Sequence, residues 1–529
     1  INNTYSTGAV SADLNYGGLV GFVTPGATLV NAHYNIDAVS ITGFTPASPS
    51  TRVAVTGLIT TGGLFGTQYT DWFTPALDGL AITDTAKLAS YFGSPDASGY
   101  YSLTSSTDLK NYLGYSDQAT LKFKLANNIT MDAGVFVPYV SGFFDANGKT
   151  ITDLALSQYT SNLGFIGYLN GRTVTDALNG LTMANASVSG KLNTGTEVGT
   201  SYVRAITNAV AAGTVTGSDI GYTPDPGDTV YGGSSNAGAS NAGGVVGLIN
   251  ATVNTNNVIN NVTSSVVVNG GTNVGGMVGR LNTGTLTGST SSGAVTGVNN
   301  TGGMVGRLYY GALTGSVSTS AVTGTSNTTG GLVGYLEHGS SLLNTSSHTT
   351  GLVKGTSYVG GLIGQSQGVV GEAVINSTPT YTTFASSNVE ASGNYVGGLI
   401  GSASGTVRNS SVSGTVTGFS SGYSGYYVGG LIGESSATTS WNRYIGSLVK
   451  GSHQTGGLIG RNNTAITNSY STGEVQSNST YVGGLVGWTN ASITGTTSTV
   501  GSTTYATGNV TATNATGGLV GYADWTNAV

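Results

Sequence analysis

The chain has 529 residues, of which only 7% are charged, and a formal net charge of −6. Average globular chains hold about 25% charged residues, and nucleic-acid binding needs clustered Lys and Arg, so the composition argues against a nucleic-acid partner. The absence of Cys excludes disulfide scaffolds, thiolate metal sites and Cys nucleophiles. The sequence contains no run of 18 apolar residues, so we expect no membrane-spanning segment.

Small and uncharged polar residues dominate the rest of the composition. The chain holds 87 Gly, 140 Ser and Thr together, and 43 Asn, while hydrophobic residues still make up 38%. That apolar fraction argues against disorder. A surface made of Ser, Thr, Asn and Tyr indicates an extracellular, secreted setting such as a cell wall or matrix.

One motif recurs along the chain: Gly-Gly-aliphatic-aliphatic-Gly, with Phe allowed at the fourth place. Its copies begin at Gly17, Gly62, Gly243, Gly275, Gly302, Gly330, Gly360, Gly397, Gly429, Gly456, Gly483 and Gly517. From Gly243 onward the spacing is 27 to 37 residues, and 27 recurs three times. Short β-prone runs at such a period predict an all-β parallel β-solenoid with one coil for each repeat of about 27 residues.

Residues 1–66 are predicted to be solenoid coils at the end of an array. The first ten residues, INNTYSTGAV, resemble ITNSYSTGEV at 466–475, so the chain begins in the second half of a coil. It finishes with GGLVGYADWTNAV at 517–529, the first half of a coil, and joining tail to head gives a motif spacing of 29. An arbitrary cut through a solenoid would also leave two half-coils.

This match predicts that the chain is its own partner. Either separate subunits stack head to tail into a filament, or the 529 residues are one period of a longer tandem chain. The residues expected at the head-to-tail contact are Ile1, Tyr5, Tyr522, Trp525 and Val529.

Residues 67–160 interrupt the motif, and we expect a junction or cap that covers open strand edges and starts the next array. Short helices are predicted within 83–93 and 105–114 from the capping residues and apolar spacing. In DANGKT, Asp145 and Asn147 could hold calcium, but the remaining ligands of such a loop are missing and Asp-x-Asn-Gly also forms a plain turn. We therefore expect no metal.

Residues 161–529 are predicted to form the main array, with degenerate motif copies at 162–169 and 197–203 and a loop insertion near 218–243. The minimal unit 456–482 holds three β-prone runs, with Ile466 and Val475 facing the core. Adjacent Leu458 and Ile459 should point to opposite faces, unless the chain bends at the flanking glycines. Those glycines are interpreted as tight turns and places of close approach between coils. The 218–243 loop is read as filler rather than a contact surface.

Chemistry-bearing residues are scattered. Arg280 and Arg307 follow consecutive GGMVG motifs, so they should stack on the outer face. Like charges so close hint at an anionic ligand, although a solvated surface pair is the preferred interpretation. His33, His338, His348 and His453 show no metal spacing. No convergent carboxylates emerge, so we expect neither catalytic residues nor a cofactor, and a polysaccharide-active enzyme is the least favoured alternative.

Asn-x-Ser/Thr acceptors for glycosylation number fifteen, which the composition largely explains. Examples are Asn128, Asn261, Asn327, Asn462 and Asn514.

The string VGGLIG followed by ITNSYSTGEV resembles the GLUG repeat of large bacterial surface proteins, notably exoproteins of the filamentous-haemagglutinin type exported by two-partner secretion. Residues 121–156 are similar to the segment that begins such arrays. The resemblance implies a right-handed parallel β-helix on an extracellular adhesive or structural fibre. We therefore expect a non-enzymatic fibre subunit, and the alternative is an adhesin stalk whose outward ladders contact glycan or a cell surface.

Overall fold

The computed structural model describes most of the chain. The described residues are 2–6, 30–34, 85–112, 116, 120–132, 136–140, 142–157, 162–169, 178–190, 193–201, 205–217, 241–250, 258–343, 347–371, 381–418, 427–495 and 503–524. The chain divides into two compact units, unit 1 over Ile1–Ser240 and unit 2 over Asn241–Val529. The boundary falls inside the insertion expected near 218–243. The boundaries expected after 66 and 160 lie outside the described residues and stay predictions.

The first described strands of unit 1 form a parallel pair. β1 (Asn2–Ser6) lies beside β2 (Val30–Tyr34), and Asn2 pairs with Val30. The offset of 28 residues matches the repeat spacing of the sequence and agrees with solenoid coils in this segment.

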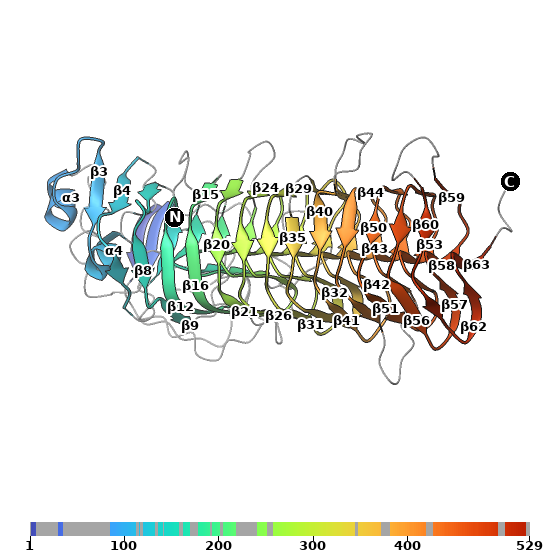
Figure 1. The fold of residues 1–529 in the computed structure, drawn as a ribbon. Helices are drawn as coiled ribbons and strands as arrows, with labels where there is room; N and C mark the ends of the chain where they lie inside the picture. The colour runs from blue at the N-terminus through green and yellow to red at the C-terminus, as the bar shows by residue number, and fades with distance from the viewer. Residues whose placement is uncertain are drawn as a thin grey trace. The chain divides into compact units, whose positions relative to one another are not determined.

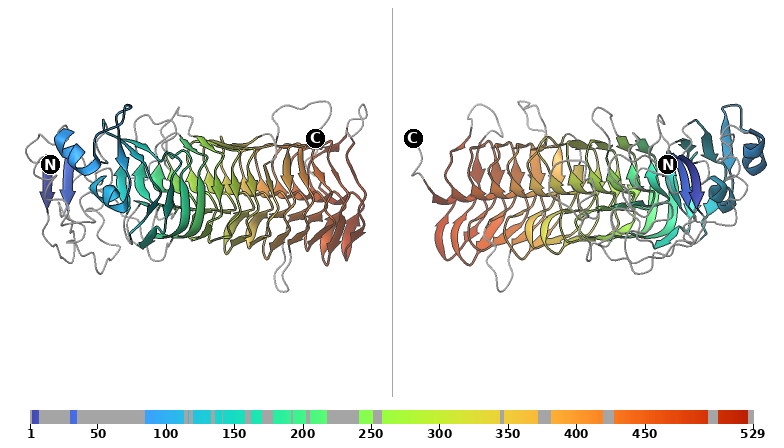
Figure 2. Two further views of the ribbon diagram at one scale, coloured as in Figure 1. Left: turned by 60° about the vertical axis from the view of Figure 1, so that its left-hand side comes forward. Right: turned by 180° about the vertical axis from the view of Figure 1, so that it is seen from behind.

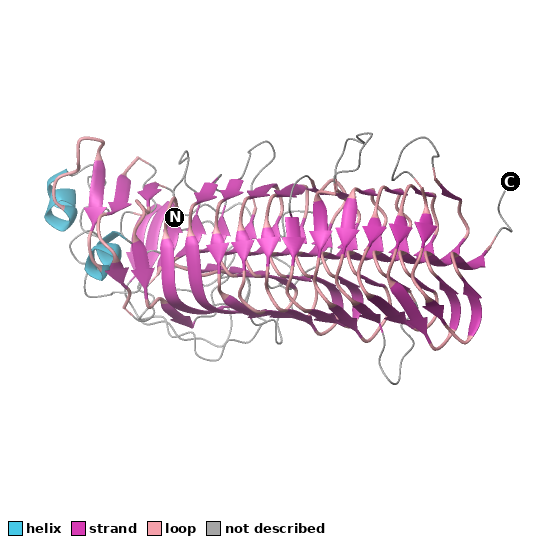
Figure 3. Ribbon diagram, in the orientation of Figure 1, coloured by secondary structure: helices cyan, strands magenta, loops and turns pink. Residues whose placement is uncertain are grey.

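Two short helices follow, where the sequence predicts them. They are α3 (Thr85–Phe92) and α4 (Ser106–Tyr112), and both contact β3 (Tyr100–Leu103) (Figure 3). The Ser105 hydroxyl accepts a hydrogen bond from the Asp108 amide at 3.2 Å, which caps the start of α4. Since helices this short are marginal in isolation, their buried apolar side chains hold them in place.

Strand stacking continues where the motif is interrupted. β3, β4 (Lys122–Leu125) and β7 (Phe143–Asp145) pair in parallel with offsets of 22 and 21 residues. Their inward residues are Tyr101, Phe123 and Phe144, and Phe92 of α3 contacts Phe123 edge-on at 5.0 Å. Shorter coils filled by aromatic rings thus replace the aliphatic coils here.

The degenerate motif copies of unit 1 also stack. β11 (Ile166–Leu169) pairs in parallel with both β6 (Val137–Val140) and β14 (Val198–Ser201). A second stack joins β8 (Thr150–Thr152), β12 (Thr182–Gly190) and β16 (Val210–Gly217). The copies at 162–169 and 197–203 are therefore structural repeats.

In unit 2 each coil repeats five short strands. In the coil that starts at Gly456 they are β52 (Thr455–Gly456), β53 (Ile459–Asn462), β54 (Ile466–Thr467), β55 (Tyr470–Ser471) and β56 (Glu474–Ser477). The sequence predicts three runs. The turn at Asn468 divides the run AITNSYS into two strands, and β52 is an additional strand before the bend at Gly457 and Leu458. Strands in equivalent places pair in parallel from coil to coil, so unit 2 is a parallel β-helix (Figures 1 and 2).

The strand that follows each Gly-Gly pair carries the site described below. In unit 2 this column consists of β18 (Val246–Ile249), β23 (Val278–Leu281), β28 (Val305–Leu308), β33 (Val333–Leu336), β38 (Ile363–Ser366), β43 (Ile400–Ala403), β48 (Ile432–Ser435), β53, β58 (Val486–Thr489) and β63 (Val520–Ala523).

Both adjacent aliphatic residues of the motif face the core. Leu458 and Ile459 are each fully buried, as are the predicted core residues Ile466 and Val475. The chain therefore bends between β52 and β53, which was one of the two alternatives left by the sequence. A Cβ on Gly457 would lie 2.1 Å from the carbonyl oxygen of Gly484 in the next coil. Close approach between coils, and not a positive φ, thus requires this glycine.

Candidate functional site

The residue after the third motif Gly forms a line on the outer side of unit 2, called the outer ladder below. In register it comprises Leu248, Arg280, Arg307, Tyr335, Gln365, Ser402, Glu434, Arg461, Trp488 and Tyr522. Most of these side chains are partly exposed, whereas their neighbours on the same strands are buried. The ladder places varied chemistry at the coil spacing of about 4.8 Å.

Opposite charges meet at one point of the outer ladder. Arg461 Nη1 lies 3.3 Å from Glu434 Oε1, and the guanidinium lies 5.0 Å from the Trp488 ring centroid. Partial burial raises the pKa of Glu434, and the charge of Arg461 opposes that rise. The pair is held between aromatic rings, because Tyr427 also lies 5.3 Å from the Arg461 guanidinium.

A second line of aromatic residues runs beside the outer ladder, two residues before each Gly-Gly pair. Tyr358 and Tyr395 stack with ring centroids 4.4 Å apart, and Tyr427 follows Tyr395 at 5.2 Å. Tyr481 lies 4.7 Å from Tyr522 of the outer ladder. Burial and the neighbouring Tyr358 raise the pKa of Tyr395 to about 12, so the Tyr395 phenol stays neutral at physiological pH.

Several of these tyrosines have an unusual backbone. The φ angles of Tyr358, Tyr395 and Tyr481 are 53°, 62° and 60°. Left-handed conformations cost about 1–2 kcal/mol for residues with a Cβ and are worth examining for function. We call Tyr358, Tyr395, Tyr427, Tyr481, Trp488 and Tyr522, with the pair Glu434–Arg461, the aromatic band. The signal was present in the sequence, since YVGG occurs four times, at 358, 395, 427 and 481.

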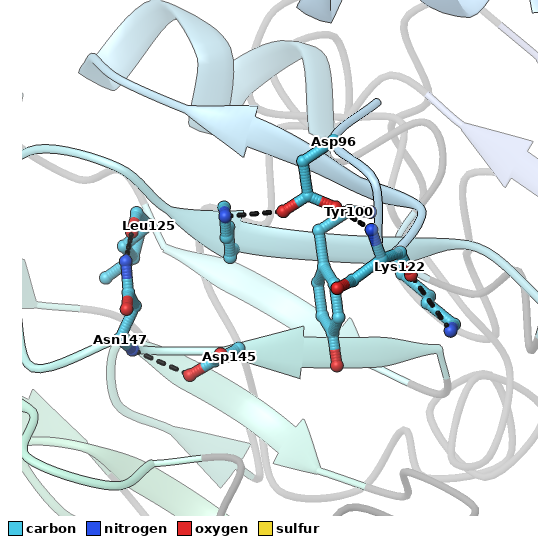
Figure 4. A network of polar contacts seen from close by, with 8 residues as sticks. Asp96, Tyr100, Lys122, Leu125, Asp145 and Asn147 are labelled. Atoms are coloured by element: carbon cyan, nitrogen blue, oxygen red, sulfur yellow. Dashed lines mark hydrogen bonds and ion pairs between the residues drawn. The ribbon is translucent and has the colours of Figure 1, made fainter. Parts of the chain in front are cut away.

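Unit 1 carries a charged network on β3, β4 and β7 (Figure 4). Lys124 donates to Asp96 at 2.6 Å, and this bond is the main reason that the pKa of Asp96 falls to about 2. The Lys122 ammonium lies 5.6 Å from the ring centroids of both Tyr100 and Phe143. The charged side chains find their partners within the network itself, so the network is interpreted as a structural feature of unit 1.

The possible calcium residues lie in this same region. Asp145 Oδ1 accepts a hydrogen bond from the Asn147 amide at 2.7 Å, and Asn147 has a φ of 50°. The Asn147 side chain donates to the Leu125 carbonyl at 3.0 Å. These bonds define the plain Asx turn that was the preferred interpretation. Across the described residues, no group of three or more His, Cys, Asp or Glu side chains converges.

The arginine pair is brought together as predicted, but its environment differs. Arg280 pairs with Arg307 in register. The expectation of a solvated pair is wrong, because only 7% of Arg280 and 6% of Arg307 is exposed. Arg307 forms an ion pair with Glu337 and lies 5.8 Å from the Tyr335 ring centroid.

The other predicted site residues have mixed outcomes. Gly243 and the motif glycines after it are described, while Gly17 and Gly62 lie outside the described residues. Asn128, Asn261, Asn327 and Asn514 are exposed. The prediction of Asn462 as a glycosylation acceptor is corrected by the structure. Asn462 is fully buried, and its Nδ2 donates to the Thr464 carbonyl and the Thr489 hydroxyl. It therefore cannot accept a glycan in the folded chain.

Of the expected head-to-tail residues, Tyr522 is 42% exposed. Tyr5 is described only as part of β1, and Ile1, Trp525 and Val529 lie outside the described residues. The four histidines are not brought together in the described part of the chain.

Comparison with known proteins identifies the repeat motif. The model of the GLUG motif matches residues 392–417 and 451–476, so this parallel β-helix carries GLUG repeats. Halomucin of Haloquadratum walsbyi is 31% identical over 159 residues, which cover 27% of this chain but only 2% of Halomucin. These matches do not show a likeness to filamentous haemagglutinins.

Among solved structures, a candidate immunoglobulin A1 protease from Bacteroides ovatus is 20% identical, with a TM-score of 0.37 over 48% of this chain and 78% of that one. Neither α3 nor α4, the helices of the described residues, is long and apolar enough to cross a membrane.

Proposed function

We propose that the chain is a non-enzymatic structural repeat of an extracellular fibre, in which β-helix coils stack end to end. The GLUG motifs, the partial likeness to Halomucin and the Ser-, Thr- and Asn-rich composition support a secreted repeat protein. The scattered carboxylates of unit 2 support a role without catalysis.

One observation carries the stacking proposal. The coil at 503–524 keeps the strand register of its neighbours, and β58 pairs with β63 through Val486 and Val520. Yet Leu519 is 40% exposed, whereas its counterpart Leu485 is fully buried. The exposed Leu519 is an apolar residue that a further coil would cover.

The experiment is to measure the intact polypeptide mass of the assembled material and to image it by negative-stain electron microscopy. We expect fibres. A mass near 52.8 kDa would mean non-covalent head-to-tail stacking, and a much larger mass would mean a tandem chain. Particles that stay single at high protein concentration, with a polypeptide of this mass, would contradict the proposal.

A second candidate function, glycan or cell-surface binding, is favoured by the aromatic band. Exposed aromatic rings beside a charged pair offer both an apolar face and polar groups to a saccharide. The test is binding to a glycan array, comparing the unmodified chain with Trp488→Ala. Gln365→Ala in the same outer ladder is the matched control, and it should leave binding unchanged. Absence of binding by the unmodified chain would exclude this function for the glycans tested.

A further inference from the structure

Arg280 is a buried cation for which the described residues provide no partner. On the outer ladder it lies between Leu248 of β18 and Arg307 of β28. Only 7% of Arg280 is exposed, and its Nε has no hydrogen-bond partner among the described residues. Among the described ion pairs and cation–π contacts, none includes Arg280. A buried guanidinium in this state is exceptional.

The neighbouring charges do not compensate it. Glu337 accepts the Nε–H of Arg307 and forms the ion pair with that residue. Two stacked cations therefore share one carboxylate. Burial and the adjacent Arg307 both lower the pKa of Arg280, while Glu337 acts in the opposite direction. An arginine nevertheless remains protonated at neutral pH.

Another arginine of the same ladder shows how the fold usually accommodates this residue. Arg461 follows Glu434 on the adjacent strand, and its side chain keeps 33% exposure to solvent. Arg280 has no carboxylate of its own, because Glu337 is paired with Arg307, and only 7% of Arg280 is exposed. Leaving a buried charge unpaired costs several kcal/mol, so an anion at this position would remove a large penalty.

We propose that Arg280 and Arg307 form a binding site for an oxyanion, namely a carboxylate or sulfate group. The planar guanidinium matches both groups with two parallel N–H donors. Such a group can come from an acidic saccharide or from a free small anion. The site does not depend on end-to-end stacking, since it lies on internal coils of unit 2.

The aromatic residues beside the pair favour a saccharide as the source. Tyr309 lies close enough to influence the pKa of Arg280, and its ring centroid is 4.4 Å from that of Tyr310. Tyr310 is 55% exposed and has a φ of 47°. The exposed ring of Tyr310, held at this backbone angle beside Tyr309, provides an apolar face for a sugar whose carboxylate meets Arg280.

The experiment measures thermal unfolding and calorimetric binding of the full chain with sodium sulfate, sodium acetate or sodium glucuronate, at ionic strength matched with sodium chloride. Glucose is the neutral control. The variants are Arg280→Leu, which copies Leu248 of the same ladder, and Arg443→Leu as the matched control, because Arg443 lies on β50 (Arg443–Tyr444), outside the outer ladder and the aromatic band. Because sulfate stabilises many proteins without binding, only the difference between variants is interpreted.

We expect an oxyanion-dependent rise in Tm for the unmodified chain and for Arg443→Leu, and affinity at least about tenfold weaker for Arg280→Leu. We also expect Arg280→Leu to melt higher than the unmodified chain in anion-poor buffer, because it removes an unpaired buried charge. If glucuronate binds more tightly than acetate and Tyr310→Ala removes the difference, the source is an acidic saccharide; equal binding identifies a free anion.

Equal oxyanion responses in the unmodified chain and Arg280→Leu would overturn the proposal. Should Arg280→Leu not fold, Arg280→Lys keeps the charge but loses the fork of donors, and unchanged sulfate binding by that variant would overturn it as well.

Discussion

At the residue scale, the least expected side chain is Glu197 in unit 1. It stands directly before β14, at the place that Leu458 occupies in its own coil, and it is fully buried. Neither carboxyl oxygen has a hydrogen-bond partner. Burial raises the pKa of Glu197 well above 4.5, so the side chain is neutral in the folded chain at moderate pH.

This carboxyl should make the stability of its coil depend on pH. Since the folded pKa is raised, the stability is fully present below about pH 4.5 and is lost as the pH rises through the folded pKa. We predict that Glu197→Leu stabilises the coil by roughly 1–3 kcal/mol at neutral pH, with a larger gain at alkaline pH. Hydrogen exchange of the amides in 193–201 at pH 5 and pH 8 measures this.

The control for that prediction is Glu390→Leu, because Glu390 is exposed and paired with Lys354 at 3.0 Å. Its effect should stay below about 1 kcal/mol. A gain for Glu197→Leu that does not grow with pH would contradict the assignment of a buried neutral carboxyl.

At the scale of the element, a left-handed turn divides several of the described coils. In the coil that starts at Gly456 it lies between the strands that end at Thr467 and begin at Tyr470. Asn468 holds this turn with a φ of 50°, and Gly288 and Gly315 occupy the same place in earlier coils with φ of 56° and 57°. Asn and Gly tolerate this conformation better than other residues. The turn explains why the run AITNSYS becomes two strands.

The effect of replacing Asn468 on stability should therefore depend on the backbone conformation as well as on the lost side chain. We predict that Asn468→Ala costs about 1–2 kcal/mol, whereas Asn468→Gly costs less, because glycine is already used there. Chemical denaturation of both variants checks the order. An alanine variant as stable as the glycine variant would show that the positive φ is not a constraint.

At the scale of the whole molecule, the motif glycines link the coils, and the last described coil provides a natural comparison. A Cβ on Gly457 would meet the Gly484 carbonyl oxygen at 2.1 Å, whereas a Cβ on Gly518 has nothing within 4 Å. We predict that Gly457→Ala destabilises unit 2 by about 3 kcal/mol, while Gly518→Ala leaves its Tm nearly unchanged.

The same pair tests the stacking proposal. If another coil covers the edge at 503–524, Gly518 needs the room that Gly457 needs inside the stack. Gly518→Ala should then fold normally but shorten or abolish fibres, as measured by sedimentation and electron microscopy. Fibres of unchanged length with this variant would show that stacking does not use this edge.

Much of the architecture could be predicted from the sequence because the repeat consists of residue types that fit only a few structural environments. The recurring Gly-Gly pair and the aliphatic residues after it predict stacked coils, and the caps of 83–93 and 105–114 predict the two helices. The strands β3, β4 and β7 could not be located from the sequence, because aromatic residues at a shorter period replace the motif there. The aromatic band was missed although YVGG recurs, because a Tyr before the motif reads equally well as filler.

The sequence by itself determined the repeat, the parallel β-helix and the alignment of Arg280 with Arg307, because a fixed period places like residues in register. Only the tertiary structure decided what surrounds them. It showed that the arginines are buried, that Asn462 is inaccessible and that Leu458 and Ile459 both face inward. Burial depends on turns and neighbouring coils that lie near in space but about 27 residues away in the chain, so no local pattern reports it.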